Sequence, residues 1–256
     1  MFSNQLRLPS RGKFFLQSAI PILMYHQIDV PPPSGTPLRG LVVSPAAFAR
    51  QMKILRLLGY KGLSLGDLMP YLRGEKKGKV VGLTFDDGYL NNLTNAMPAL
   101  CREGFTATCY AISAMMGGHN DWDADKGIAQ KKLMDVADWR EWLKSGMEIG
   151  SHTRHHADLT VIDPVAASQE IAGAKQELED RFGVEVQHFC YPYGRYSERD
   201  RGLVQDAGYV TATTTHRGRV HANADHFLLP RAMVAQATQP WQFLLKIATS
   251  YEDRRR

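Results

Sequence analysis

The stretch that most constrains this chain is 80–89, where an apolar run leads directly into two adjacent aspartates and a glycine. An apolar run with β-branched members predicts a buried strand, and the Asp-Gly pair predicts that a turn follows it. Two carboxylates at the end of a buried strand repel each other and lose solvation unless a cation lies close to them. Asp86 and Asp87 therefore indicate a metal site, and the alternative is an ordinary Asp-Gly turn.

A histidine cluster later in the chain favours the metal site. Residues 151–156 read Ser-His-Thr-Arg-His-His. His152 and His156 are four residues apart, so one helical turn would direct both imidazoles the same way. With one aspartate they form a set of two histidines and one carboxylate with open positions, which suits zinc or a similar divalent metal. The alternative is a surface histidine cluster, and His155 fits that description.

The two aspartates can take different roles at such a site. Successive side chains of a strand point to opposite faces, but a turn at the strand end can bring both to one cavity. One aspartate then binds the metal. The other takes a proton from water, whose pKa the metal lowers. This pairing is suited to the attack of water on a carbonyl carbon.

The rest of the chain alternates between strand and helix patterns, which predicts a parallel sheet or barrel with functional groups at the carboxyl ends of the strands. Strands are predicted at 20–26, 80–85, 106–112, 147–151, 187–191, 209–214 and 227–230, and helices at 45–58, 65–72, 92–103, 135–145, 163–182 and 197–207. Residues 216–226 are predicted to form a loop. The candidate residues that fall at strand ends are Asp86, Asp87, His152, Tyr193 and Arg231.

Length and charge define the expected organisation. The 256 residues fit one larger α/β domain at 20–245, preceded by an extension at 1–19 and followed by a basic tail at 246–256. The formal charge of +5 is concentrated in patches, and the basic tail leaves open a peripheral contact with an anionic membrane.

The sequence also argues against several classes of protein. It lacks the interleaved basic and aromatic residues that would suggest nucleic-acid binding. No stretch approaches the ~20 apolar residues of a transmembrane helix. We find no convincing signal-peptide cleavage site and expect a cytoplasmic protein with reduced core cysteines, namely Cys101, Cys109 and Cys190.

Three motifs together resemble the signatures of one enzyme family. Residues 84–88 (Thr-Phe-Asp-Asp-Gly) and 152–156 (His-Thr-Arg-His-His) resemble the first two motifs of the NodB-homology polysaccharide deacetylases, carbohydrate esterase family 4. Residues 189–194 (Phe-Cys-Tyr-Pro-Tyr-Gly) resemble the third motif, and the similarity extends over about 22–231. The resemblance implies an α/β fold of the distorted (β/α) barrel type with seven or eight strands. It also implies metal-dependent removal of N-acetyl groups from amino sugars of a polysaccharide or glycoconjugate.

The same resemblance implies roles for individual residues. Asp86 would be the general base, and Asp87, His152 and His156 would bind a divalent metal, with Zn²⁺ as the first expectation. Tyr193 would offer its backbone N–H to the oxyanion. An aromatic residue in a Pro-Gly turn without a catalytic role is the alternative for Tyr193.

The chain departs from the family pattern in two places. The third motif lacks the arginine that orients the base, and we hypothesise that Arg231 replaces it by binding Asp86 with a two-pronged guanidinium. The alternative for Arg231 is a surface ion pair at the barrel rim. The family's Leu-x-x-His motif, which supplies the acid, has no clear match. The acid is therefore unassigned: His216, His221 and His226 are the candidates, and the alternative for each is a loop histidine without a catalytic role. His26 resembles the Leu-x-Tyr-His segment of one branch of the family and lines the cleft or sits in the core.

Two other functions remain open on the sequence. One is hydrolysis of a small amide that is not a sugar, and the other is sugar binding by a catalytically impaired member of the fold. For the deacetylase, the expected partner is an N-acetylated amino-sugar glycan or a lipid-linked sugar at the inner face of the membrane. The oligomeric state is not indicated by any sequence feature.

Overall fold

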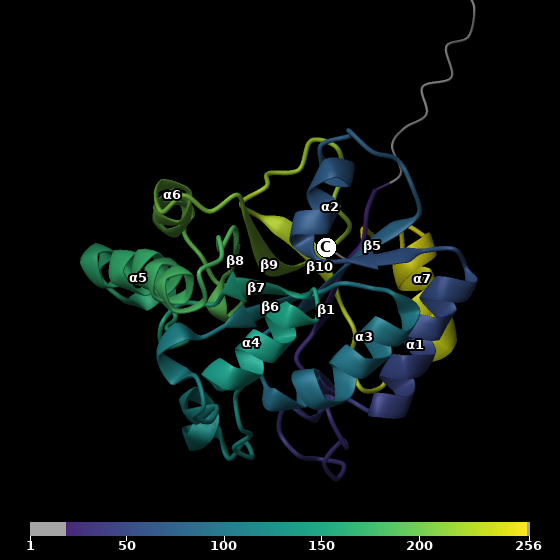
Figure 1. Cartoon of the computed structure of the whole chain (residues 1–256), viewed down its shortest axis with the longest axis horizontal. Helices are drawn as coiled ribbons and strands as arrows, with labels where there is room; N and C mark the ends of the chain where they lie inside the picture. Colours follow the sequence, from purple (N-terminus) through teal and green to yellow (C-terminus); the bar gives the residue numbers. More distant parts are fainter. Residues whose placement is uncertain (1–18, 255–256) are drawn as a thin grey trace, which may run out of the picture.

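The computed structural model describes residues 19–254, and seven of its parallel strands close into a barrel (Figure 1). The barrel strands are β1 (Ile22–Tyr25), β5 (Val80–Phe85), β6 (Thr108–Ala111), β7 (Glu148–Ser151), β8 (His188–Cys190), β9 (Thr211–Arg217) and β10 (Leu229–Met233). They follow in sequence order around the ring, and β1 pairs with both β5 and β10, which closes it. The expected distorted (β/α) barrel is confirmed.

Three shorter strands lie outside this ring. β4 (Lys61–Leu63) pairs in parallel with the first half of β5 as an eighth strand of the sheet. β2 (Gln27–Ile28) and β3 (Val42–Val43) form a separate two-stranded sheet. The sequence analysis did not predict β2, β3 or β4, because runs of two or three residues carry too little periodicity to be recognised.

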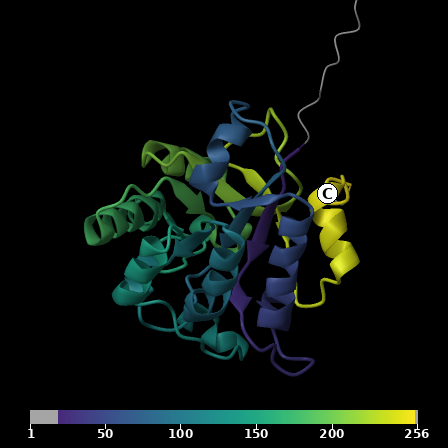
Figure 2. The same ribbon diagram turned by 45° about the vertical axis from the view of Figure 1, so that its right-hand side comes forward.

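Helices surround the barrel on its outer side (Figures 1 and 2). They are α1 (Pro45–Leu57), α2 (Leu65–Leu72), α3 (Met97–Glu103), α4 (Val136–Lys144), α5 (Pro164–Phe182), α6 (Glu198–Asp206) and α7 (Pro240–Ala248). Several of these helices begin at a side-chain cap. Ser44, Asp163 and Ser197 each accept a hydrogen bond from a backbone N–H of the first helical turn.

An aromatic cluster between the barrel and its helices fixes the end of β5. The ring of Phe85 lies 5.5 Å from that of Tyr25, 5.7 Å from Phe48 on α1 and 6.1 Å from Trp142 on α4. All four side chains are buried. Because side chains alternate along a strand, an outward-facing Phe85 directs Thr84 and Asp86 toward the barrel interior.

Several predicted boundaries differ from the structure. The single helix predicted at 92–103 is a π-helical segment (Asn92–Ala96) followed by α3. β9 extends to Arg217, so His216 and Arg217 belong to a strand rather than to the predicted loop. Cys101 is exposed on α3, whereas Cys109 and Cys190 are buried as expected, and all three are free thiols.

The C-terminal boundary also needs correction. The predicted start of the basic tail falls inside α7, which stands beside α1 (Figure 2) and receives a hydrogen bond from Tyr60 to the carbonyl of Ile247. Glu252 is fully buried. Residues 246–253 are therefore part of the folded domain. Most of the predicted extension (residues 1–18) and the last two arginines of the tail lie outside the described residues. Among the described residues, no helix is long and apolar enough to span a membrane.

Candidate active site

Asp86 and Asp87 both face one cavity at the carboxyl end of β5. Strand alternation alone would separate them, but Asp87 (φ 72°) and Gly88 (φ 70°) adopt left-handed backbone conformations that turn the chain. A Cβ atom on Gly88 would lie 2.8 Å from the Trp139 ring, so glycine is required there on both counts. The two residues are 3% and 6% exposed. The prediction that the turn brings both aspartates to one cavity is confirmed.

The cavity has a volume of about 460 Å³, within the usual range for sites that bind small molecules. All six residues that the sequence analysis assigned to the site line it, namely Asp86, Asp87, His152, His156, Tyr193 and Arg231. Five of them follow the carboxyl ends of parallel strands, which share one end of the barrel, and Arg231 reaches the same cavity from within β10.

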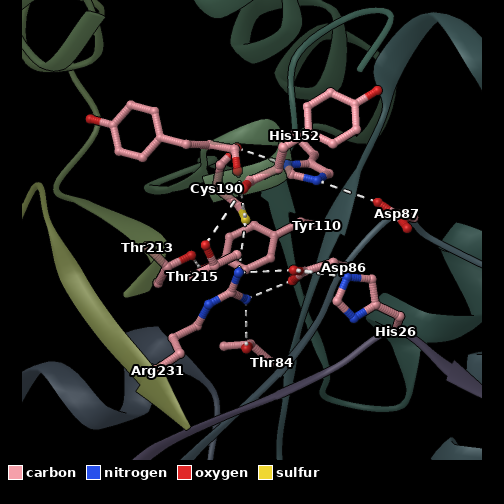
Figure 3. Close-up of polar contacts among 12 residues, drawn as sticks. His26, Thr84, Asp86, Asp87, Tyr110, His152, Cys190, Thr213, Thr215 and Arg231 are labelled. Carbon is pink, nitrogen blue, oxygen red and sulfur yellow. Dashed lines mark hydrogen bonds and ion pairs between the residues drawn. The ribbon is translucent and has the colours of Figure 1, made fainter. Parts of the chain in front are cut away.

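Asp87, His152 and His156 form a compact buried cluster suited to a metal ion. Nε2 of His152 lies 3.4 Å from Oδ1 of Asp87, and Nε2 of His156 lies 3.5 Å from the same oxygen. One potential ligand atom from each residue lies within 4.8 Å of the others. Nδ1 of His152 lies 2.7 Å from the carbonyl oxygen of Cys190 (Figure 3). When Nδ1 donates its proton to this carbonyl, Nε2 keeps the lone pair that a metal needs.

The two histidines meet through a tight turn and not through the predicted helical turn. Thr153 (φ 66°) and His156 (φ 58°) both adopt left-handed conformations, which a helix excludes. The backbone N–H of Ser113 donates to the carbonyl of Thr153 and helps to hold this turn. His155 points away from the cavity. Its side chain is 54% exposed and lies 2.6 Å from Glu170, as expected for a residue outside the metal set.

Ring contacts, rather than a hydrogen bond, hold His156. Its ring stacks on Trp122 at 4.6 Å and meets Tyr193 edge-on at 4.6 Å. Its Nδ1 is buried and has no hydrogen-bond partner among the described residues. Burial and the neighbouring His152 lower the pKa of His156 to about 3. The imidazole is thus neutral near pH 7, which is the form that binds metals.

Arg231 binds Asp86 with a two-pronged guanidinium, as hypothesised. Nη1 donates to Oδ1 at 2.6 Å and Nη2 to Oδ2 at 2.8 Å (Figure 3). Both side chains are buried, so the alternative of a surface ion pair is excluded. Arg231 lies in the middle of β10 and not at its end as predicted. Its side chain therefore reaches Asp86 inside the barrel.

The Asp86 carboxylate is ionised in this setting. Burial alone would raise its pKa, but the positive charge of Arg231 and the neighbouring His26 outweigh this effect and hold the pKa below its usual value. The remaining donors of Arg231 are engaged by other barrel residues: Nε donates to the carbonyl of Thr214 at 2.9 Å, and Nη1 also contacts Thr84 at 3.1 Å.

His26 is the further histidine of the cavity. Its Nε2 lies 3.7 Å from Oδ2 of Asp86, on the other side of this carboxylate from Arg231 (Figure 3). The three candidate acids His216, His221 and His226 do not line the cavity formed by the described residues. His216 lines other depressions, and Nε2 of His221 lies 3.4 Å from Oδ2 of Asp253. The sequence signals for His26 were its position at the end of the first predicted strand and the resemblance to the Leu-x-Tyr-His segment.

Four further residues at the site had no sequence signal. Arg217, Lys246 and Glu252 line the cavity, and Trp122 stacks on His156. Trp122 belongs to a glycine- and aspartate-rich segment that lies between the predicted strand at 106–112 and the predicted helix at 135–145. Lys246 and Glu252 belong to the predicted basic tail, where a local pattern gives no reason to expect burial.

Together these features define a (β/α)-barrel enzyme with a possible buried Asp/His/His metal centre and a second, ionised aspartate beside it. The chain belongs to the polysaccharide deacetylase family, a family of hydrolases, whose family model matches residues 73–212. The motifs at residues 84–88, 152–156 and 189–194 lie within this range and supply five of the six predicted site residues. Arg231 lies beyond it.

Individual relatives support the assignment. The chain is 31% identical over 218 residues to the putative polysaccharide deacetylase YxkH of Bacillus subtilis, covering 84% of this chain and 71% of that protein. The Streptococcus pyogenes deacetylase PplD, solved in complex with acetate, is 27% identical with a TM-score of 0.79 over 90% of this chain and 98% of that one. The putative polysaccharide deacetylase BA0330 of Bacillus anthracis is 30% identical with a TM-score of 0.75, covering 90% and 69%.

Proposed function

We propose that this protein is a divalent-metal-dependent hydrolase that removes N-acetyl groups from amino sugars of a polysaccharide or glycoconjugate. The observation that carries the proposal is the pairing of two sites in one cavity. An ionised aspartate, held by Arg231, lies directly beside an Asp/His/His cluster. Membership of the polysaccharide deacetylase family supports the same reaction class.

The cluster of Asp87, His152 and His156 fits a catalytic metal. Two imidazoles and one carboxylate form a three-ligand set of the kind that catalytic zinc uses. Zn²⁺ is therefore the metal that we propose. When bound, such an ion would polarise the acetamide carbonyl and make water a better nucleophile near pH 7.

The residues around the cluster would move the protons. Asp86 would take a proton from the attacking water, and Arg231 keeps both of its oxygens oriented for this step. The backbone N–H of Tyr193 would donate to the negative charge that develops on the carbonyl oxygen. His26 would donate a proton to the departing sugar amine, since it reaches the cavity and the three predicted acids do not.

Acetate release tests the proposal directly. The metal-loaded protein should release acetate from N-acetylglucosamine oligomers, and dialysis against a chelator should abolish the release until metal is restored. The measurement is enzymatic detection of acetate, with metal content determined in parallel. Acetate from small aryl acetamides alone would point to a non-sugar amidohydrolase. Oligomer binding without acetate would point to a sugar-binding protein.

Variants of the three histidines at 152–156 test the metal centre within that assay. His152→Ala and His156→Ala should each lose the metal and the activity, because each removes one of only three protein ligands. His155→Ala is the matched control, since its side chain points outward to Glu170, and it should keep both. Elemental analysis of the purified variants decides the question. A metal-free His155→Ala would show that the ligand set is wrong.

The acid role of His26 predicts a dependence on the leaving group. His26→Gln should lower acetate release from the acetamide by about 10²–10⁴, the usual scale for removing a general acid. It should lower release from an aryl acetate ester far less, because a phenolate leaves without a proton. Comparing kcat/KM for the two substrates measures this difference. Equal losses on both would assign His26 to another role.

A further inference from the structure

A second charged cluster lines the same cavity on the side formed by β9 and the C-terminal segment. Nζ of Lys246 on α7 lies 2.7 Å from Oε1 of Glu252. Arg217, at the end of β9, donates to both Glu252 oxygens: Nε contacts Oε2 at 2.5 Å and Nη2 contacts Oε1 at 3.2 Å. Glu252 is fully buried and Lys246 is 8% exposed. None of these groups takes part in the chemistry assigned to Asp86 and the metal ligands.

The charges on this wall do not balance. Two cations, Arg217 and Lys246, share the single carboxylate of Glu252. The acids nearest to them along the cavity are engaged elsewhere: Asp86 binds Arg231, and Asp87 lies against the two histidines. Asp253, the next residue along the chain, pairs with Arg219 at 2.7 Å and is not among the described residues that line the cavity.

An excess positive charge on a nearly buried group is costly unless an anion approaches it. Lys246 carries three donors, and one of them is used by Glu252. The cavity is the side from which a further partner can come, because both cations line it. Glu252 holds both head groups in place, as the carboxylate partners of substrate-binding cations commonly do.

We propose that Arg217 and Lys246 form a subsite that binds an anionic substituent, a carboxylate or a phosphate, on the glycan that carries the acetamide. The inference rests on the proposed deacetylase function and names its substrate class. Glu252 is the positioning residue of this subsite. An acidic amino-sugar substrate would then place its acetamide at the Asp/His/His cluster and its anion against Arg217 and Lys246.

The charge balance predicts opposite effects for two substitutions. Lys246→Met removes the excess positive charge and should weaken the preference for an anionic substrate on the order of tenfold, the scale of one charge-assisted hydrogen bond. Glu252→Gln removes the negative charge and should strengthen this preference. A purely structural cluster predicts a loss of stability in both variants and no change of preference in either. The sign of the change therefore separates the two roles.

The experiment compares three N-acetylglucosamine oligomers that differ in one group: a neutral oligomer, one with a carboxylate on the neighbouring sugar and one with a phosphate there. The readout is the ratio of kcat/KM for each anionic substrate to that for the neutral one, with thermal unfolding measured in parallel. We expect the wild type to prefer one of the two anionic oligomers. The preferred oligomer shows whether the substituent is a carboxylate or a phosphate. Lys175→Met is the matched control, because Lys175 is also ion-paired, to Glu179 at 2.8 Å, but lies away from the cavity.

Failure of this inference is distinguishable from failure of the proposed function. Release of acetate with equal kcat/KM for all three oligomers would overturn the subsite and leave the deacetylase intact. If no oligomer releases acetate, calorimetric titration with the same three sugars decides the subsite. Tighter binding of an anionic sugar to the wild type than to Lys246→Met supports the subsite. Equal binding of all three sugars overturns it.

Discussion

Asp86→Asn should keep its metal and lose about 10²–10⁴ in kcat, the usual scale for removing a general base. Asparagine has nearly the same shape as aspartate but cannot accept the proton, and Asp86 is not one of the three residues whose ligand atoms converge. Arg231 would face an amide in place of a carboxylate, so some loss of stability is expected as well. Metal analysis, thermal unfolding and acetate release on one preparation give all three quantities.

The neighbouring aspartate provides the contrast. Asp87→Ala should lose metal and activity together, because its Oδ1 is the oxygen that both histidine Nε2 atoms approach. Restoring activity with excess metal should succeed only partly. Equal loss of metal in the Asp86 and Asp87 variants would contradict the division of roles between them.

The positions of these two aspartates could be predicted from the sequence because the determinants are local. A buried apolar strand must end where two carboxylates begin, and Gly88 marks the turn that redirects Asp87. The helices at 45–58 and 163–182 could also be predicted from the sequence, since Ser44 and Asp163 are N-caps that act within one helical turn.

The turn that joins His152 to His156 could not be predicted from spacing. A separation of four residues suits a helix, but residues 152–156 follow β7 directly and pass through two left-handed conformations. Contacts with distant segments support this path, such as the hydrogen bond from Ser113 to the Thr153 carbonyl. The convergence of the two imidazoles was predicted from the wrong local geometry, because both geometries direct them to one point.

Long-range charge pairing explains the other failures. Lys246 and Glu252 are polar residues near the chain end, where sequence patterns favour an exposed tail. They are buried because they form an ion pair with each other, and because Arg217 on β9 forms a second ion pair with Glu252. The sequence alone could not decide whether His26 lines the cleft or sits in the core. Only closure of the barrel, which pairs β1 with β5, places it against Asp86.

The pairing of Arg231 with Asp86 connects two strands that are distant in sequence but share the barrel interior. The guanidinium is restrained on three sides, by the Thr214 carbonyl, by Thr84 and by Sγ of Cys190 at 3.2 Å. With its Nε and both Nη groups engaged, it cannot rotate without breaking several contacts. It can therefore orient the base strongly, and it cannot act as an acid because arginine stays charged at all relevant pH values.

Arg231→Ala should accordingly lower kcat much more than it raises KM, while the metal content stays near that of the wild type. It should also lower the free energy of unfolding by about 3–5 kcal/mol, because it leaves Asp86 as an unpaired buried charge. Arg231→Lys should restore part of kcat, since an ammonium supplies the charge but not the two-pronged geometry. Steady-state kinetics, elemental analysis and denaturant unfolding on the three proteins test these expectations.

A control is needed because a destabilised enzyme can lose activity for reasons unrelated to Asp86. Arg199→Ala serves this purpose: Arg199 pairs with the fully buried Asp200 at 2.6 Å, and neither residue lines the cavity. Its removal should destabilise the fold by a similar mechanism and leave kcat close to that of the wild type. If the two alanine variants lose kcat equally, the effect of Arg231 is one of folding. If Arg231→Ala retains wild-type kcat, Asp86 does not depend on Arg231 for its orientation.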